Sequence, residues 1–380
     1  MTAASRSTPC AVCGAAAWTP LPDPGPQSMA SDWRVVAEPL ARHACGVCAL
    51  ARRWPGAASS DALYRSGYEL YAHAPGEARE RARQQQYAAW IAGALPAQPA
   101  QLLDVGCGNG SLLRALREHW PAARLLGCDP SAESVAHGAG VDLRLWQGTA
   151  ADLPADAVSD LVVSVNVIEH THEPLAFLEG LRRATARDGW LAVVCPDGGR
   201  PNLELLFADH VFSFAPPHLR ALAARAGLDV VRVSPAPGDL GPFQMIVARP
   251  AASATHVAAP RLEGAAARAA YLSAWASLDE RLLERTSEAV VCFGAGEAAG
   301  LLRAYAPRTW SRVHACTVDG QPSGRFGALP IVPLDAVAGG ATMLIGVRPF
   351  DQPRVAERLR ARFPRVVTWY DLLDGGEGGW

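Results

Sequence analysis

The stretch Leu-Leu-Asp-Val-Gly-Cys-Gly-Asn-Gly at residues 102–110 decides the fold of this chain. Apolar residues lead into glycines at alternate positions, and an amphipathic run over 111–118 follows them. This order is typical of a buried strand that ends in a tight turn and opens a helix, as in nucleotide-binding α/β folds. Because glycines let a ligand approach the backbone closely, the turn predicts a binding site.

The spacing of the glycines indicates the kind of ligand. The dinucleotide fingerprint is G-x-G-x-x-G, whereas Gly106, Gly108 and Gly110 form G-x-G-x-G with Asp104 just before them. A carboxylate beside the turn disfavours a polyanion and favours a cationic ligand. Asp129 follows the apolar run 125–128, at the place where such folds hold a ribose diol. A tight turn without a ligand would leave Asp129 unexplained.

Together these residues resemble the S-adenosylmethionine site of the Rossmann-like methyltransferases. The resemblance implies that the segment 148–154 lines the adenine and that the end of the strand at 159–165 lies beside the methionine part of the cofactor. The cofactor-binding residues that it implies are Asp104, Gly106, Cys107, Gly108, Gly110, Asp129, Pro130, Thr149, Ala150, Ala151, Asn166, Val167 and His170.

Four cysteines near the N-terminus have the spacing of a structural zinc site. Cys10 and Cys13 form one C-x-x-C pair, Cys45 and Cys48 form another, and a Pro-rich stretch separates the pairs. Each pair supplies two thiolates from one tight knuckle, and a tetrahedral ion would tie together a segment too short to build a core. A redox C-x-x-C and scattered free thiols are the alternatives.

Composition narrows the class of protein. The chain has 380 residues and a formal net charge of −2, and all 35 of its basic residues are arginine. Without lysine, a Schiff-base enzyme, a pyridoxal enzyme and a P-loop nucleotidase are excluded. There is no basic run for nucleic acid, no apolar stretch long enough to span a membrane and no secretory signal. We therefore expect a cytoplasmic protein whose partner is a small molecule, in an oligomeric state that the sequence leaves open.

The pattern of apolar runs predicts an α/β fold with several domains. Over 101–250 short Val/Leu-rich runs alternate with amphipathic helices, which favours a parallel sheet covered by helices. The expected strands are 101–105, 123–128, 143–147, 159–165, 190–195 and 230–233. The expected domains are a zinc-binding domain at 1–58, a helical connector or lid at 59–100, the S-adenosylmethionine-binding domain at 101–250, a linker helix at 251–286 and a second Rossmann-like domain at 287–380.

The last of these domains begins with a second glycine turn. The strand expected at 290–293 leads into Gly294, Gly296 and Gly300, and further strands are expected at 312–318 and 342–347. A lone motif of this kind is weak evidence of ligand binding, so nucleotide recognition and a merely tight turn both stay open.

Over nearly the whole chain, this domain order resembles the zinc-containing sugar C-methyltransferases that act on nucleotide-activated keto-deoxysugars. In that family a Tyr-His-Glu-His segment removes a proton beside the sugar ketone. Asp209 and His210 match the last two positions, whereas Phe207 and Ala208 stand at the first two. The resemblance implies His210 as the base, with Asp209 orienting it. It further implies a nucleotide-linked sugar as substrate and methylation at carbon. Because Phe207 and Ala208 replace the Tyr and the first His, methylation at nitrogen or oxygen stays open as well.

Other site residues and functions follow from the same sequence. His170 is a second candidate acid–base group, although its position favours a histidine that only caps the loop. Expected contacts to the substrate come from Tyr68, Tyr71, Gly294, Gly296 and Glu297. One alternative function is an NAD(P)-dependent oxidoreductase that uses the second glycine turn, with Asp319 on the ribose. Another is a non-catalytic module that binds zinc and cofactor for interaction.

Overall fold

The computed structural model describes residues 8–54, 78–96, 98–138, 140, 142–252, 258, 260–286, 288–320 and 324–373. The chain divides into two compact units, and each is described by itself. The first comprises Met1–Thr19, His43–Gly199 and His210–Glu263, and the second comprises Pro20–Arg42, Arg200–Asp209 and Gly264–Trp380.

The first unit is built on a seven-stranded sheet of order β12-β13-β10-β9-β6-β7-β8. The strands from β8 to β10 are parallel, and β13 runs antiparallel to both β10 and β12. Their bounds are β6 (Gln101–Val105), β7 (Arg124–Asp129), β8 (Arg144–Gln147), β9 (Ser159–Val165), β10 (Thr185–Pro196), β12 (Leu228–Pro235) and β13 (Phe243–Pro250).

Each of the six strands expected over 101–250 overlaps a strand of this sheet. The antiparallel hairpin of β12 and β13 differs from the expected all-parallel arrangement, because η6 (Gly238–Leu240) joins the two strands through a short connection that allows only antiparallel pairing. The buried apolar run from Met245 to Ala248 was the sequence signal for the missed strand β13.

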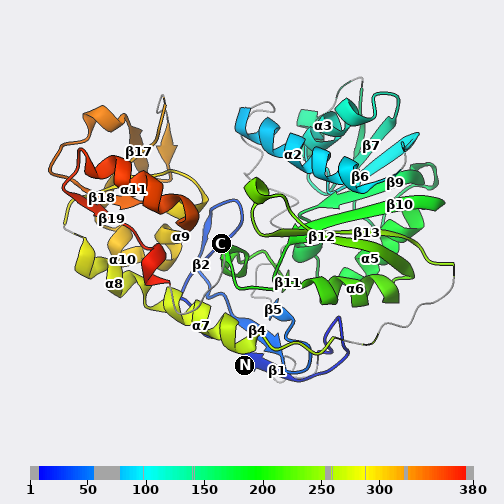
Figure 1. Cartoon of the computed structure of the whole chain (residues 1–380), viewed down its shortest axis with the longest axis horizontal. Helices are drawn as coiled ribbons and strands as arrows, with labels where there is room; N and C mark the ends of the chain where they lie inside the picture. Colours follow the sequence, from blue (N-terminus) through cyan, green and yellow to red (C-terminus); the bar gives the residue numbers. More distant parts are fainter. Residues whose placement is uncertain are drawn as a thin grey trace. The chain divides into compact units, whose positions relative to one another are not determined.

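Helices cover both faces of this sheet, as Figure 1 shows. Successive strand residues point to opposite faces, so Leu102 joins the core under α2 and α3, whereas Leu103 joins the core under α5 and α6. The sheet is therefore buried on both sides, as a parallel sheet requires. The helices are α2 (Ala78–Ala94), α3 (Ser111–His119), α4 (Ala132–Gly138), α5 (Pro174–Ala184) and α6 (Pro216–Arg225), with the short helices η3 (Ala155–Ala157) and η4 (Ile168–His170).

A small sheet of order β1-β4-β5-β11 accompanies the cysteine pairs, since Cys10 and Cys13 precede β1, Cys45 ends β4 and Cys48 lies between β4 and β5. Its last strand comes from far along the chain, since Phe212 of β11 pairs with Arg52 of β5. On α6, His218 Nε2 lies 2.7 Å from the carbonyl oxygen of Cys48, so the cysteine region packs against the α6 side of the larger sheet. The strands are β1 (Trp18–Pro20), β4 (Arg42–Cys45), β5 (Ala51–Arg53) and β11 (Phe212–Ser213).

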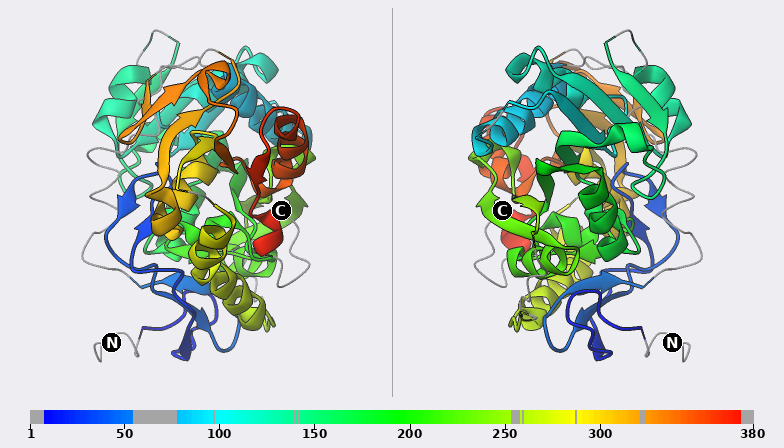
Figure 2. Two further views of the ribbon diagram at one scale, coloured as in Figure 1. Left: turned by 90° about the vertical axis from the view of Figure 1, so that its left-hand side faces the viewer. Right: turned by 90° about the vertical axis from the view of Figure 1, so that its right-hand side faces the viewer.

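The second unit contains a six-stranded sheet of order β16-β17-β15-β14-β18-β19, parallel except for the pair β16 and β17. Helix α11, red in Figures 1 and 2, lies beside β18 and β19. The strands are β14 (Val290–Phe293), β15 (Val313–Thr317), β16 (Arg325–Phe326), β17 (Leu329–Val332), β18 (Thr342–Ile345) and β19 (Arg365–Val367).

The other elements of the second unit complete this α/β arrangement. The hairpin of β2 (Ser28–Met29) and β3 (Val35–Val36) contacts α9. The helices are α7 (Ala265–Ala276), α8 (Leu278–Arg285), α9 (Glu297–Tyr305), α10 (Pro307–Trp310) and α11 (Gln352–Arg360), with η5 (Leu203–Leu206), η7 (Leu334–Ala336), η8 (Pro349–Asp351) and η9 (Tyr370–Leu372). Within the described residues, every helix is too short or too polar to cross a membrane.

Candidate functional site

The glycine turn lies at the carboxyl end of β6, where parallel α/β sheets bind ligands. Gly106, Gly108 and Gly110 have φ angles of 84°, 53° and 76°, in the left-handed region that favours glycine. A Cβ atom on Gly106 would lie 2.3 Å from Val167 Cγ2, and one on Gly110 would lie 2.8 Å from Leu143 Cδ1. The backbone conformation therefore favours glycine at all three positions, and close packing also excludes a side chain at Gly106 and Gly110.

Asp129 fastens the glycine turn to the end of β7. Its Oδ2 accepts a hydrogen bond from the Gly108 amide at 2.9 Å, and its Oδ1 accepts one from the Ser131 amide at 2.8 Å. Burial raises the pKa of the Asp129 carboxyl above its ordinary value. The neighbouring Pro130 accepts a hydrogen bond at its carbonyl from Gln147. Asp129 thus shapes the turn and still offers carboxylate lone pairs to a diol.

Asp104 is a buried acid beneath the turn. It is 2% exposed, and its Oδ1 has no hydrogen-bond partner among the described residues. Burial, and then the nearby charge of Asp129, raise the pKa of Asp104 to about 8. A cation beside the turn would favour the ionised form, so this donor set fits a positively charged ligand such as a sulfonium.

The raised pKa of Asp104 predicts how stability depends on pH. Between the ordinary pKa of an aspartate and about 8, the folded chain holds a proton at Asp104 that the unfolded chain has lost. The free energy of unfolding should therefore fall as pH rises through this window. Asp104→Asn removes the effect, so the variant should gain stability relative to wild type as pH rises. Urea unfolding at about pH 5 and about pH 9 measures the gain.

The exposed Asp229→Asn is the matched control for this experiment and should show the same difference from wild type at both pH values. An Asp104→Asn variant that also kept a constant difference would contradict a raised pKa at Asp104.

The segment expected along the adenine forms a tight turn after β8. Thr149 Oγ1 donates to Asp152 Oδ2 at 2.8 Å and accepts from the Ala151 amide at 3.3 Å. Ala150 is buried. The Thr149 hydroxyl therefore fixes the turn itself.

Asn166 ends β9 in a left-handed conformation, with φ of 57°. Its Nδ2 lies 3.4 Å from the Tyr87 hydroxyl, whereas its buried Oδ1 has no hydrogen-bond partner among the described residues. Tyr87, on α2, is a neighbour of Asn166 that the sequence did not reveal. Its helix showed only a polar and aromatic pattern, and a hydrogen bond across so many residues leaves no local signal.

Glu169, His170 and His210 form a cluster beside the end of β9. The two imidazole rings meet edge to face with centroids 4.7 Å apart, and His170 Nε2 lies 4.0 Å from Glu169 Oε1. One ligand atom from each of the three residues lies within 4.8 Å of the others. Glu169 and His210 are 2% and 5% exposed. The cluster thus places two imidazoles and a carboxylate where they can exchange protons.

The residues before His210 are held within the second unit. Phe207 forms a bridge with Met29, and its carbonyl accepts from Arg42 at 3.0 Å. Asp209 accepts from the amide and the hydroxyl of Ser31, at 2.8 and 2.5 Å. These contacts show that Asp209 anchors the segment that leads to His210.

The four N-terminal cysteines converge in the first unit. Their sulfur atoms all lie within 4.8 Å of one another, with Cys10 and Cys48 at 3.6 Å and Cys13 and Cys45 at 3.5 Å. Thiolates about 2.3 Å from one tetrahedral zinc ion are about 3.8 Å apart. The donor set therefore fits zinc.

Packing explains two of the three glycines in the second glycine turn. A Cβ atom on Gly294 would lie 2.2 Å from the carbonyl oxygen of Gly346, and one on Gly300 would lie 2.7 Å from Met29 Sδ. At Gly296 the same atom would meet open space at the start of α9, next to Glu297. Asp319 forms an ion pair with Arg358 at 2.9 Å.

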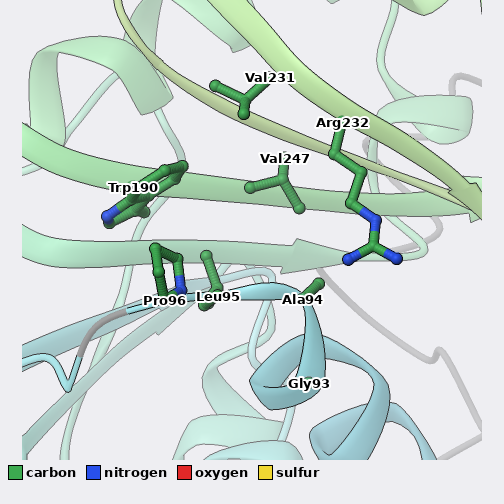
Figure 3. A pocket seen from close by; sticks show the side chains of 8 residues that line it. All are labelled: Gly93, Ala94, Leu95, Pro96, Trp190, Val231, Arg232 and Val247. Carbon is green, nitrogen blue, oxygen red and sulfur yellow. The ribbon is translucent and has the colours of Figure 1, made fainter.

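A pocket of about 480 Å³ lies elsewhere in the first unit (Figure 3). Trp190, Val231, Arg232 and Val247 stand over the segment from Gly93 to Pro96. Trp190 pairs with Leu161, early in β9, so this pocket lies away from the carboxyl ends of the strands and the glycine turn. Tyr68 and Tyr71, the expected substrate contacts from the connector, lie outside the described residues.

Comparisons with known proteins find similarity to methyltransferases over the part of the chain that contains the glycine turn. Residues 79–233 match the family model of a methyltransferase domain. The chain carries a class I S-adenosylmethionine-dependent methyltransferase domain. It is 41% identical over 129 residues to the malonyl-acyl-carrier-protein O-methyltransferase of Herminiimonas arsenicoxydans, covering 33% of this chain and 49% of that protein.

Two further proteins are similar over part of the domain. The ubiquinone biosynthesis O-methyltransferase of Cereibacter sphaeroides is 36% identical over 99 residues, covering 23% of this chain and 38% of that protein. A methyltransferase of calicheamicin biosynthesis, solved in its SAH-bound form, shares 22% identity over 46% of this chain and 54% of that chain, with a TM-score of 0.38. The chain spans less than half the length of both curated relatives.

Proposed function

We propose that the whole chain is an S-adenosylmethionine-dependent methyltransferase that acts on a small biosynthetic intermediate. The observation that carries the proposal is the glycine turn of the first unit, which Asp129 fastens to β7 above the buried Asp104. A buried acid with an unsatisfied oxygen suits a cationic cofactor, and an acid at the end of the second strand suits its ribose.

The residues of the site divide into binding and proton-transfer groups. Asp104, Gly106, Gly108 and Asp129 would hold the cofactor, with Thr149–Ala151 along the adenine and Asn166–Val167 by the methionine part. When bound, S-adenosylmethionine supplies an activated methyl group, so the protein needs mainly to orient the acceptor and exclude water. His210 would take the proton of the acceptor, with the neighbouring imidazole of His170 able to receive it.

For the acceptor we propose a nucleotide-linked sugar, methylated at carbon, nitrogen or oxygen. Support comes from the resemblance in domain order and from the open space at Gly296, where α9 begins. Gly294, Glu297, Tyr68 and Tyr71 would contribute to this second part of the site. Phe207 and Ala208 have no side-chain group that could take a proton, whereas the sugar C-methyltransferases have a Tyr and a His at these positions. An amine or hydroxyl acceptor, which needs less help than a carbon, is therefore favoured.

Equilibrium titration of the full chain tests the cofactor. We expect S-adenosylmethionine and S-adenosylhomocysteine to bind, and NADH to bind far more weakly. The second glycine turn has the spacing G-x-G-x-x-x-G, which departs from the dinucleotide fingerprint G-x-G-x-x-G and so argues against an NAD(P)-dependent oxidoreductase. Tight binding of NADH alone would overturn the proposal. Tight cofactor binding without methyl transfer to any deoxysugar nucleotide, amine or hydroxyl acceptor would favour a non-catalytic module.

A further inference from the structure

Glu169, His170 and His210 come from two separate segments of the first unit. Glu169 and His170 belong to η4, which closely follows β9, whereas His210 stands two residues before β11. The Arg53 amide donates to the Val211 carbonyl at 2.8 Å, which fixes the backbone beside His210. Because η4 also contacts β11, the fold of one unit brings the three side chains together.

The ligand atoms of these three side chains are nearly as close as metal coordination requires. One nitrogen or oxygen atom from each residue lies within 4.8 Å of the other two, and His170 Nε2 lies 4.0 Å from Glu169 Oε1. Nitrogen and oxygen ligands about 2.1 Å from a tetrahedral ion are about 3.4 Å apart. Small side-chain rotations therefore close the remaining gap.

The chemistry of the cluster suits a divalent transition-metal ion. Imidazole and carboxylate are ligands of zinc, cobalt and iron, and two imidazoles with one carboxylate leave at least one position open. Glu169 and His210 are 2% and 5% exposed, so water screens the attraction between the carboxylate and a cation only weakly. The His170 side chain is 11% exposed, which leaves one side of the cluster accessible from solvent.

The cluster differs in kind from the four N-terminal cysteines. Within the ranges that the structure describes, these are the two groups of three or more metal-ligating side chains whose ligand atoms converge. The cysteines offer four sulfur atoms, which complete the coordination of a tetrahedral ion, whereas the cluster after β9 offers three nitrogen and oxygen atoms. The second group therefore has the composition of a site whose ion exchanges with solvent.

We propose that Glu169, His170 and His210 form a second metal site, which binds an exchangeable divalent ion such as zinc or cobalt and thereby blocks proton transfer. A nitrogen lone pair that binds an ion cannot accept a proton at the same time. Occupancy therefore converts His210 from a base into a ligand. The binding of the ion goes beyond the proposed function, whereas the block on proton transfer rests on it.

Titration with Co²⁺ tests the second metal site. We expect the full chain, with zinc in its cysteine cluster, to bind one Co²⁺ ion with the weak visible absorption of nitrogen and oxygen ligands. The strong near-ultraviolet band of cobalt bound to thiolate should be missing. Glu169→Gln and His170→Ala should each weaken Co²⁺ at least about tenfold, since loss of a direct ligand should cost no less than loss of an outer-shell partner. The zinc content of both variants should match wild type.

His137→Ala is the matched control, because His137 is an exposed histidine of α4 outside the cluster, and it should leave the affinity for Co²⁺ unchanged. Nuclear magnetic resonance identifies the ligands directly. Paramagnetic cobalt shifts the ring protons of coordinated histidines far outside their usual range. At saturating Co²⁺, wild type should show such signals from two imidazoles, and His170→Ala should show them from one at most.

Methyl transfer from S-adenosylmethionine, measured with added Co²⁺, tests the block on proton transfer. Turnover of wild type should fall with the same midpoint concentration as the spectroscopic titration, and a weak chelator should restore it. Turnover that is unchanged or raised at saturating Co²⁺ would overturn the block.

The binding experiments separate the metal site from the proposed function. No Co²⁺ binding, a thiolate spectrum, undiminished binding by Glu169→Gln and His170→Ala, or loss of binding in His137→Ala would overturn the second site. A chain that binds Co²⁺ as expected, yet fails to bind S-adenosylhomocysteine, would overturn the proposed function and leave the metal site in place.

Discussion

Replacing His210 by alanine is expected to lower turnover by about 10²–10⁴-fold, the range typical of a lost general base, while the Kd of S-adenosylmethionine stays nearly unchanged. The reason is the position of His210. Its ring meets His170, and the adjacent Val211 carbonyl accepts from the Arg53 amide at 2.8 Å, so the imidazole is held beside the end of β9 by a sheet contact. In the proposed function, the glycine turn and Asp129 would bind the cofactor without help from His210.

The pH profile distinguishes a base from a merely structural histidine. Wild-type turnover should rise with pH as the imidazole loses its proton, and the residual activity of His210→Ala should lack that limb. His137→Ala is the matched control, because His137 is an exposed histidine on α4 whose Nδ1 lies 2.8 Å from the Glu133 carbonyl oxygen. Turnover that is unchanged in His210→Ala on the true acceptor would remove this residue from the mechanism.

The sequence predicts the part of the candidate site whose residues lie close together in the chain. Gly106, Gly108 and Gly110 are close neighbours, and their spacing already predicts a tight turn that a ligand can approach closely. The structure adds that all three have a left-handed backbone. Asp129 was predicted as a ribose contact from its place after an apolar run. The structure shows a second role for Asp129, which also accepts a hydrogen bond from the Gly108 amide and so stabilises the glycine turn.

The contacts that the sequence did not predict join residues far apart in the chain. Tyr87 and Asn166 meet because α2 packs on the face of the sheet to which Val163 of β9 points. The sequence of α2 is only weakly amphipathic, so it does not identify this partner. His170 and His210 come together because β11 adds to β5 of the small N-terminal sheet. Contacts of this kind depend on tertiary packing, so they cannot be recognised in a short stretch of a single sequence.

The position of the cysteine cluster predicts a large effect of zinc on the first unit. Cys10 and Cys48 belong to the same hydrophobic core as Leu219 and Leu222 of α6. The region has only short strands of its own, so its folding should depend on the metal. Structural zinc contributes about 10–16 kcal/mol to the folding of small zinc domains near neutral pH. We therefore expect one tightly bound zinc ion per chain and a marked fall in the thermal unfolding midpoint on chelation.

Cys48→Ser should abolish this zinc and lower the midpoint as chelation does, and a chelator should then produce no further change. Cys195→Ala is the control, since it removes a buried thiol from β10 outside the cluster and should leave the zinc content at one ion per chain.

The expected destabilisation reaches beyond the N-terminal segment because His218 of α6 contacts the Cys48 carbonyl. Hydrogen exchange should accordingly show lost protection in α6 as well as around the cysteines. Zinc-free protein that contains a Cys10–Cys13 disulfide and keeps the wild-type midpoint would instead support the redox alternative.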